Sequence, residues 1–275
     1  MGDSCIVGSG AMSSIFRPGL LDGRCALVTG GGTNLGRHAA AELVACGARV
    51  VIAGRTEEVL ASAAGEIGCE YVVGDIRDPS SAAAIAGAAG SSLDLLVNNA
   101  GGQYFVPAES ITAKGWAAVM RLNVEGTMTM TEAALPALRA ASGMVVNVTV
   151  SPHHGMAAMA HTGAARAAVE ALTRSLSVGE PDVAFVAAAI GRFDTESLRK
   201  YPEVVLRGAA RSVPLQRLGR MEEFGWLIAM LATPAGRALD GSVVTLDGGV
   251  DNWTGPWPPP NIVDDEGAVP TEERR

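Results

Sequence analysis

The sequence lacks several features that would point to other classes of protein. Its four cysteines lie far apart and form no Cys-x-x-Cys pair, at Cys5, Cys25, Cys46 and Cys69. With no His/Cys cluster either, a zinc site is not expected, and we predict no metal. No run of about 20 apolar residues is present to span a bilayer. The first 14 residues lack the basic and apolar segments of a signal peptide, so we expect a cytoplasmic protein.

Basic residues are also few and scattered. Acidic residues outnumber Lys and Arg by 29 to 21, which gives a net charge of -8. This balance argues against nucleic acid or an anionic membrane as a partner, so we expect a small-molecule substrate. The 275 residues, 48% of them apolar, suffice for one large core.

Short apolar segments alternate with Ala- and Leu-rich segments of helical pattern. The expected strands are 25–29, 49–53, 70–73, 93–97, 144–149, 183–188 and 242–246. The expected helices are 35–46, 57–65, 79–89, 113–140, 157–178 and 222–232. Strands of nearly continuous hydrophobicity are typical of a parallel sheet covered on both faces. The pattern predicts an α/β fold, a Rossmann-like doubly wound parallel sheet of about seven strands in a single domain.

The two ends of the chain depart from this pattern. Residues 1–14 are small and polar and are expected to be a disordered leader before a domain spanning 15–252. Residues 253–275 are Pro-rich and acidic and are expected to form an irregular C-terminal tail. The tail is either loose or a strap, since Trp253 and Trp257 are large apolar side chains that could anchor it.

A glycine-rich segment, TGGGTNLG from Thr29 to Gly36, follows the first expected strand and opens the first expected helix. Glycine lets the backbone turn sharply and approach a pyrophosphate, and the helix N-terminus supplies unpaired N–H groups. An ordinary glycine turn is the alternative. The strand before it and the helix after it favour a dinucleotide-binding loop.

These residues resemble the short-chain dehydrogenase/reductase family over about residues 20–250. Asn34 replaces the middle glycine of the family's loop, and Asn tolerates the left-handed backbone region. In the segment beside the nicotinamide, Ile190 replaces a proline. The cofactor contacts implied by the resemblance are Gly30, Thr33, Asn34, Leu35, Gly36, Asp75, Ile76, Asn99, Ala100, Gly101, Gly191 and Thr195.

The second expected strand ends in Gly54-Arg55, without the acidic residue that holds the ribose 2′-hydroxyl in NAD enzymes of this kind. Arg37 and Arg55 could instead hold a 2′-phosphate in bidentate fashion, so we predict NADP(H). The alternative is that both arginines are ordinary solvated surface residues.

Within the family, the chain is similar to peroxisomal-type trans-2-enoyl-CoA reductases and to bacterial citronellol-type dehydrogenases. The residues that carry this likeness are 14–21, 98–104, 114–116 and 161–166. The likeness implies an oxidoreductase that acts on an apolar chain. The family also implies a homodimer or homotetramer built on two long central helices.

The family's catalytic Ser, Tyr and Lys map to Val150, Thr162 and Arg166, so all three are replaced. The dienoyl- and enoyl-CoA reductases of the family move the Tyr to the strand end, and that position is Ser151 here. Arg166 can hold ribose hydroxyls and stabilise negative charge, but it cannot exchange protons near neutral pH. Ser151 and Thr162 can donate hydrogen bonds to an oxyanion.

Other polar residues are expected near the same place. Asn123 matches the helix Asn that anchors a water in the family's proton relay, and Tyr104 is expected to border the nicotinamide. His153, His154 and His161 flank the expected substrate channel and could act as a general acid, or be solvated or packing residues. Our candidate catalytic residues are Arg166, Asn123, Ser151, Thr162, His161 and Tyr104.

Two functions remain open. The favoured one is an NADPH-dependent reductase of an activated carbonyl or conjugated enoyl group, whose substrate stabilises its own enolate and needs little enzymatic acid. The other is a non-redox cyclase or isomerase, or a silent homologue, which Asn34, Ile190 and the missing catalytic residues favour. Intact loop glycines, Asp75 and Asn123 favour retained cofactor binding.

Overall fold

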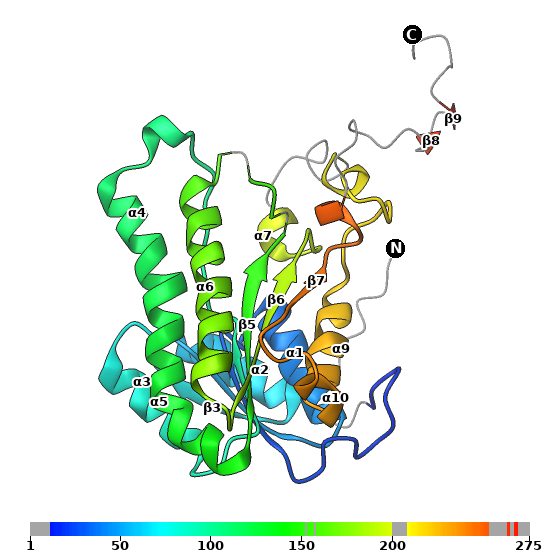
Figure 1. Ribbon diagram of the computed structural model, residues 1–275. Coiled ribbons are helices and arrows are strands. Elements are labelled where there is room, and N and C mark those ends of the chain that lie inside the picture. Colours follow the sequence, from blue (N-terminus) through cyan, green and yellow to red (C-terminus); the bar gives the residue numbers. More distant parts are fainter. Residues whose placement is uncertain are drawn as a thin grey trace.

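Seven parallel strands form one sheet through the middle of the protein (Figure 1). The computed structural model describes residues 12–151, 153–156, 158–199, 208–252, 263–264 and 267–268. The strands are β1 (Cys25–Thr29), β2 (Arg49–Gly54), β3 (Glu70–Val73), β4 (Leu95–Asn98), β5 (Met144–Val150), β6 (Ala184–Ile190) and β7 (Val243–Leu246). Their order is β3-β2-β1-β4-β5-β6-β7, which confirms the predicted fold. The order reverses between β1 and β4, where sheets of this kind bind ligands beyond the carboxyl ends of the strands.

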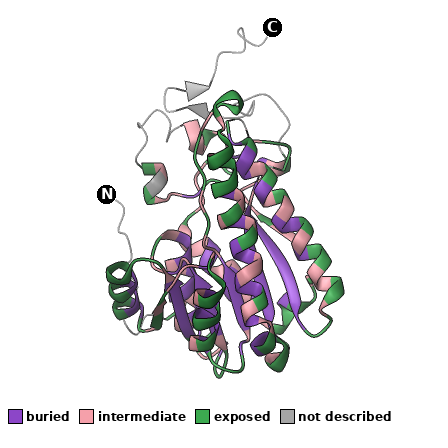
Figure 2. Cartoon of the chain, turned by 90° about the vertical axis from the view of Figure 1, so that its left-hand side faces the viewer, coloured by how far each residue is buried: buried purple, intermediate pink, exposed green. Residues whose placement is uncertain are grey.

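Helices cover both faces of the sheet. On one face lie α1 (Asn34–Ala45), α2 (Glu57–Ile67) and α9 (Met221–Leu231); on the other lie α3 (Pro79–Ala89), α4 (Ala113–Met120), α5 (Gly126–Ala141) and α6 (Ala160–Gly179). The side chains of neighbouring residues in one strand therefore pack in different hydrophobic cores, one on each face of the sheet. Leu27 packs in one core and Val28 in the other, and both are fully buried. Figure 2 shows the strands buried between the helical layers. This double coverage explains the continuous hydrophobicity of the strands.

The expected helix 113–140 is divided by a π-helical segment, η2 (Arg121–Glu125), between α4 and α5. Side chains bond to the backbone here: Asn123 Nδ2 donates to the carbonyl of Val119 at 2.9 Å, and Thr127 Oγ1 donates to the carbonyl of Asn123 at 2.8 Å. The division of the helix was not predicted, because hydrophobic periodicity does not reveal bonds between side chains and the backbone. Segments of this kind are frequent at functional sites.

Two short helices were not predicted, α7 (Glu196–Arg199) and α10 (Pro234–Arg237), because four residues are too few for a periodic pattern. The helix expected from residue 157 begins at Ala160 instead.

The ends of the chain differ in part from expectation. Residues 1–11 of the expected leader lie outside the described residues, but Ser13 is bonded into the domain. Its hydroxyl donates to Glu42 of α1 at 2.5 Å and accepts the backbone N–H of Phe16 at 2.9 Å. In the expected irregular tail, β8 (Val263–Asp264) and β9 (Gly267–Ala268) pair in antiparallel fashion. Trp253 and Trp257 lie outside the described residues.

Candidate active site

The glycine loop turns sharply at the carboxyl end of β1. Gly30 has φ +66 and Asn34 has φ +45, so asparagine adopts the left-handed conformation in the glycine's place. A Cβ on Gly36 would overlap the carbonyl oxygen of Gly30 and lie 2.5 Å from Nδ2 of Asn99. The turn implied by the resemblance is therefore formed, and it leaves no space for a side chain at residue 36.

The residues that follow β4 hold this loop in place. Asn99 Nδ2 donates to the carbonyls of Thr29 and Gly30 at 3.0 and 3.2 Å. The Thr29 hydroxyl accepts the backbone N–H groups of Asn99 and Ala100, each at 3.1 Å. Thr33 precedes α1 without a side-chain capping bond, and the first turn contains no acidic residue. Within that first turn no carboxylate neutralises the positive end of α1, which can receive an anionic group.

The segment after β6 lies against the glycine loop. Asn34 Oδ1 accepts the backbone N–H of Glu196, at the start of α7, at 3.2 Å. The Thr195 hydroxyl accepts the N–H of Leu198 at 3.3 Å. Gly191 passes so close to Asp247 that a Cβ there would lie 2.5 Å from the Cβ of Asp247. Two sets of expected cofactor contacts, far apart in sequence, thus lie together.

The two arginines expected at a 2′-phosphate differ in surroundings. Arg37 is ion-paired with Glu66 of α2. Arg55 is exposed, and its charge contributes to a low pKa of Asp75. The main cause of that low pKa, about 2, is the side-chain hydrogen bonding of Arg77, whose Nε lies 2.9 Å from the carboxylate. Arg55 is therefore the more available cation at the end of β2.

Arg166 and Asn123 meet at the end of β4. Arg166 Nη1 donates to the carbonyl of Val148 at 2.8 Å. A Cβ on Gly101 would lie 2.7 Å from Arg166 Nη2 and 2.8 Å from Asn123 Oδ1, so only glycine fits between them. Asn123 is buried and bonds the backbone of Gly102 in both directions, at 2.9 and 3.2 Å. Its amide thus fixes the segment after β4.

Ile76, another expected cofactor contact, packs against the start of α5. Its side chain is buried, 6% exposed, and a Cβ on Gly126 would lie 3.0 Å from it. The side chain of Ile76 therefore packs at the start of α5.

Arg166 is a cation without an acidic partner. Its Nε is buried with no hydrogen-bond partner, and among the described residues no carboxylate lies within ion-pair distance of it. Burial lowers the pKa of Arg166 to about 10, so the side chain stays charged at neutral pH. One turn earlier on the same helix face, Thr162 is fully buried and its hydroxyl has no partner in the described part of the chain. Arg166 as a whole is half-buried, and a partly desolvated cation without a counter-ion is costly. A ligand carrying negative charge would relieve that cost.

The remaining candidates contact other side chains of the protein. The Ser151 hydroxyl donates to Asp247. His161 is fully buried, and its ring packs edge-on against Tyr104 with centroids 4.4 Å apart. Neither ring nitrogen of His161 has a hydrogen-bond partner in the described part of the chain. The Tyr104 hydroxyl lies against Gly115 of α4, where a Cβ would overlap it. Tyr104 and His161 thus form an aromatic pair that joins the segment after β4 to α6.

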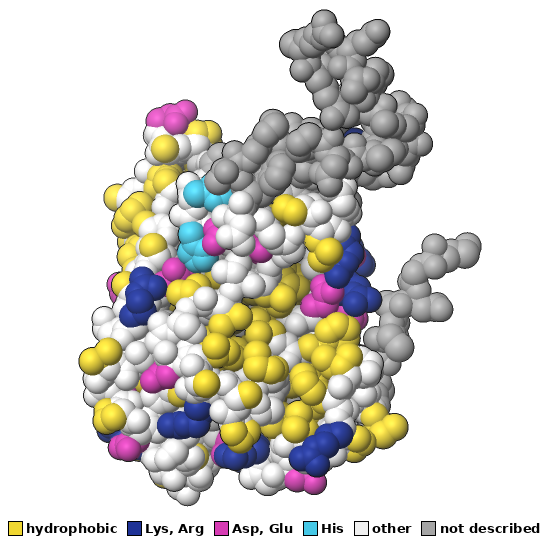
Figure 3. Space-filling view, turned by 45° about the vertical axis from the view of Figure 1, so that its right-hand side comes forward, with side chains coloured by type: hydrophobic (Ala, Val, Ile, Leu, Met, Phe, Trp, Pro, Cys, Tyr) yellow, Lys and Arg dark blue, Asp and Glu magenta, His cyan; other side chains and the backbone are white. Residues whose placement is uncertain are grey.

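His153 has two carboxylate partners that were not foreseen from the sequence. Its Nδ1 lies 2.6 Å from Asp251 of η3 (Val250–Asn252), and its Nε2 lies 2.8 Å from Glu170 of α6. Burial lowers the pKa of His153, but the two carboxylates outweigh this effect and the net change is upward. Figure 3 shows histidine beside acidic side chains on this part of the surface.

His153, Glu170 and Arg166 line one cavity of about 390 Å³, together with Val150 and residues of the segment between β5 and α6. In the ranges that the structure describes, no group of His, Cys, Asp and Glu is arranged to hold a metal. No helix in those ranges is long and apolar enough to cross a membrane.

Residues 31–251 match a family model described as enoyl-(acyl carrier protein) reductase. The chain belongs to the short-chain dehydrogenase/reductase family. One relative is the rhamnolipids biosynthesis 3-oxoacyl-[acyl-carrier-protein] reductase of Pseudomonas aeruginosa, 34% identical over 83% of this chain and 96% of the relative. A peroxisomal 2,4-dienoyl-CoA reductase of Pongo abelii is 32% identical over 90% of this chain and 89% of the relative.

Solved structures of the same family are similar to this chain in both fold and sequence. The citronellol catabolism dehydrogenase of Pseudomonas aeruginosa is 34% identical, with a TM-score of 0.77 over 86% of this chain and 99% of that one. The RhlG/NADP active-site complex from the same organism is 33% identical, with a TM-score of 0.79 over 86% of this chain and 100% of that one. These matches confirm the predicted family and the similarity to a citronellol-type dehydrogenase. The peroxisomal relative named above is a dienoyl-CoA reductase rather than the trans-2-enoyl-CoA type inferred from the sequence.

Proposed function

We propose that the protein is an NADPH-dependent oxidoreductase that reduces an activated carbonyl or conjugated enoyl group of an apolar substrate without the usual Tyr-Lys pair. The observation that carries this proposal is Arg166, a half-buried cation without an acidic partner among the described residues. It stands at the family's Lys position, with Thr162 and Val150 at the Tyr and Ser positions. A site with a fixed positive charge and without the family's Tyr-Lys pair suits a substrate that stabilises its own enolate.

The cofactor site fits a phosphorylated dinucleotide. The glycine loop and the uncapped start of α1 would hold the pyrophosphate, and exposed Arg55 would hold a 2′-phosphate. The NADP complex of RhlG, with its matching fold, supports the same assignment. When bound, the nicotinamide supplies the hydride.

The protein's own part in the reaction is electrostatic. Arg166 would stabilise the negative charge that develops on the substrate oxygen, and the unpartnered Thr162 hydroxyl would donate a hydrogen bond to it. Neither side chain is an acid near neutral pH, so the proton would come from another group, such as a histidine of the site, or from solvent. Ser151 donates to Asp247 and would have to leave that bond to contribute.

A paired-substrate assay tests the proposal. NADPH oxidation is followed with a conjugated enone or enoyl thioester and with the saturated ketone of the same length. Turnover of the conjugated substrates alone supports electrostatic catalysis. Equal turnover of the saturated ketone would reveal a conventional acid and contradict the proposal. Absence of cofactor binding would favour the non-redox cyclase, isomerase or silent homologue.

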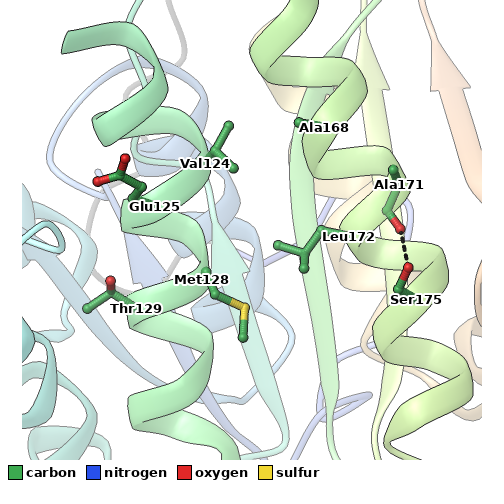
Figure 4. A pocket seen from close by; sticks show the side chains of 8 residues that line it. All are labelled: Val124, Glu125, Met128, Thr129, Ala168, Ala171, Leu172 and Ser175. Atoms are coloured by element: carbon green, nitrogen blue, oxygen red, sulfur yellow. Dashed lines mark hydrogen bonds between the residues drawn. The ribbon is translucent and has the colours of Figure 1, made fainter. Parts of the chain in front are cut away.

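We also propose a homodimer or homotetramer formed through α5 and α6. A groove of about 540 Å³ runs between these helices, with Val124 and Met128 on one wall and Ala168 and Leu172 on the other (Figure 4). The walls are mainly apolar, and the small side chains of α6 allow a helix of a second copy to approach closely. A cytoplasmic location remains a prediction.

A further inference from the structure

The segment between β5 and α6 is held in its middle by one side chain. At its start, the backbone N–H of Ser151 donates to Ile190 at 2.9 Å, and near its end the carbonyl of Ala158 accepts from Val106 at 2.8 Å. Between these points, His153 bonds Asp251 through both its backbone N–H and its ring, each at 2.6 Å, and bonds Glu170 at 2.8 Å. Among the described residues of the segment, His153 alone has a side-chain hydrogen bond to α6.

We propose that His153 is a positioning residue whose protonated ring holds this segment over the cavity that contains Arg166, so that the shape of the cavity depends on pH. We call the hydrogen bonds of His153 with Asp251 and Glu170 the clamp, and its existence is inferred from these contacts alone. Its effect on turnover rests on the function proposed above.

The arrangement requires a charged ring. A neutral imidazole offers one N–H donor, whereas each ring nitrogen of His153 faces a carboxylate oxygen that can only accept while it is ionised. Protonation supplies the second donor and a positive charge between two negative ones. Loss of the proton would leave one ring lone pair facing a carboxylate and would weaken that bond.

The two carboxylates are themselves fixed. Glu170 also accepts the hydroxyl of Thr149 at 3.0 Å, and the backbone N–H of Asp251 donates to Asp247 at 2.7 Å. The other charged groups around this cluster are Asp247, His154, whose Nδ1 lies 4.0 Å from Asp251, and Arg166 across the cavity. His153 is thus the residue that links a prearranged acidic pair to the segment.

The cavity wall depends on this link. Gly155, Met156 and Met159 of the segment line the cavity opposite α6. Gly155 has φ +121, a conformation that residues with a side chain rarely adopt. The raised pKa of His153 sets the direction of the effect. The clamp is complete below the ordinary value of about 6.5 and is lost as the pH rises through the raised value.

Hydrogen–deuterium exchange of peptides from this segment tests the inference without any substrate. Exchange rates, corrected for intrinsic pH dependence, are compared at about pH 6 and about pH 9 in the wild type, His153→Gln and the matched control His154→Gln. We expect exchange in the wild type and the control to quicken about tenfold at the higher pH, as expected for loss of a charge-assisted hydrogen bond. His153→Gln should exchange quickly at both pH values.

Two further results complete the test. The ring of His153, assigned by NMR through His153→Gln, should titrate above pH 6.5, and Asp251→Asn should lower that value. Segment exchange that is equally slow at both pH values in the wild type and in His153→Gln would overturn the clamp. If exchange responds as expected but no reduction is found with any conjugated substrate, the clamp stands and the proposed function fails.

Discussion

Replacing Arg166 by Met separates the stability of the fold from the function of the site. Met keeps most of the side-chain length and apolar stem but removes the charge. Burial lowers the pKa of Arg166 from its ordinary 12.5 to about 10, which corresponds to a cost of about 3 kcal/mol for the buried cation. The hydrogen bond to the Val148 carbonyl opposes this with about 1.5–3 kcal/mol. The two contributions nearly cancel.

We therefore expect Arg166→Met to change the free energy of unfolding by no more than about 1–2 kcal/mol, and the melting temperature by about 2–8 °C at most. Turnover should fall much further. Loss of one fixed donor to a developing oxyanion costs about 3–4 kcal/mol, or roughly a hundredfold to a thousandfold in kcat. Arg166→Lys, which keeps a positive charge, is the matched control and should retain more activity than Arg166→Met.

The assays are thermal unfolding and NADPH oxidation with a conjugated substrate. A variant that melts like the wild type and turns over at a wild-type rate would show that Arg166 is not the electrostatic group. A variant that unfolds at room temperature would show that the guanidinium is structural, and would refute the cancellation argued above.

Five other substitutions test the cofactor site and the assembly. Arg55→Ala should weaken NADPH binding about tenfold or more and leave NADH binding unchanged. Arg37→Ala should have a smaller effect, because Arg37 must first leave its ion pair with Glu66. Equal losses of affinity for both nucleotides, measured by calorimetry, would contradict the 2′-phosphate assignment. Gly36→Ala should abolish nucleotide binding because its Cβ would overlap the Gly30 carbonyl, whereas Gly65→Ala in α2, with open space around it, should bind normally; binding by both variants would count against the loop. Leu172→Asp should convert the assembly to monomers in sedimentation velocity, and a wild type that is already monomeric would refute the α5–α6 interface.

The fold follows from the sequence because each buried strand is almost wholly apolar. Predicted and observed strands differ by two residues or fewer at their ends, as in 93–97 against β4 (Leu95–Asn98). The left-handed turn at Asn34 was also foreseeable, since Asn tolerates that conformation. The π-helical segment at Asn123 was not, because it depends on side chain to backbone bonds rather than on periodicity.

The site was less predictable because its side chains come from segments that are far apart in the sequence and meet only in the folded sheet. His153 and Asp251 are 98 residues apart and meet only because β5, β6 and β7 are neighbours in the sheet. The sequence places Glu170 one turn after Arg166 but does not show that it faces His153. Ser151 likewise gains its acceptor, Asp247, from the segment that follows β7.

The most direct test of the account is calorimetric titration of the protein with NADPH and with NADH. The account predicts saturable binding of NADPH, because the uncapped end of α1 can hold its pyrophosphate. It predicts clearly weaker binding of NADH, because exposed Arg55 would contact the 2′-phosphate that only NADPH carries. Binding of neither nucleotide would mean that Asn34 and its neighbours close the cofactor site, and the non-redox function would then take precedence.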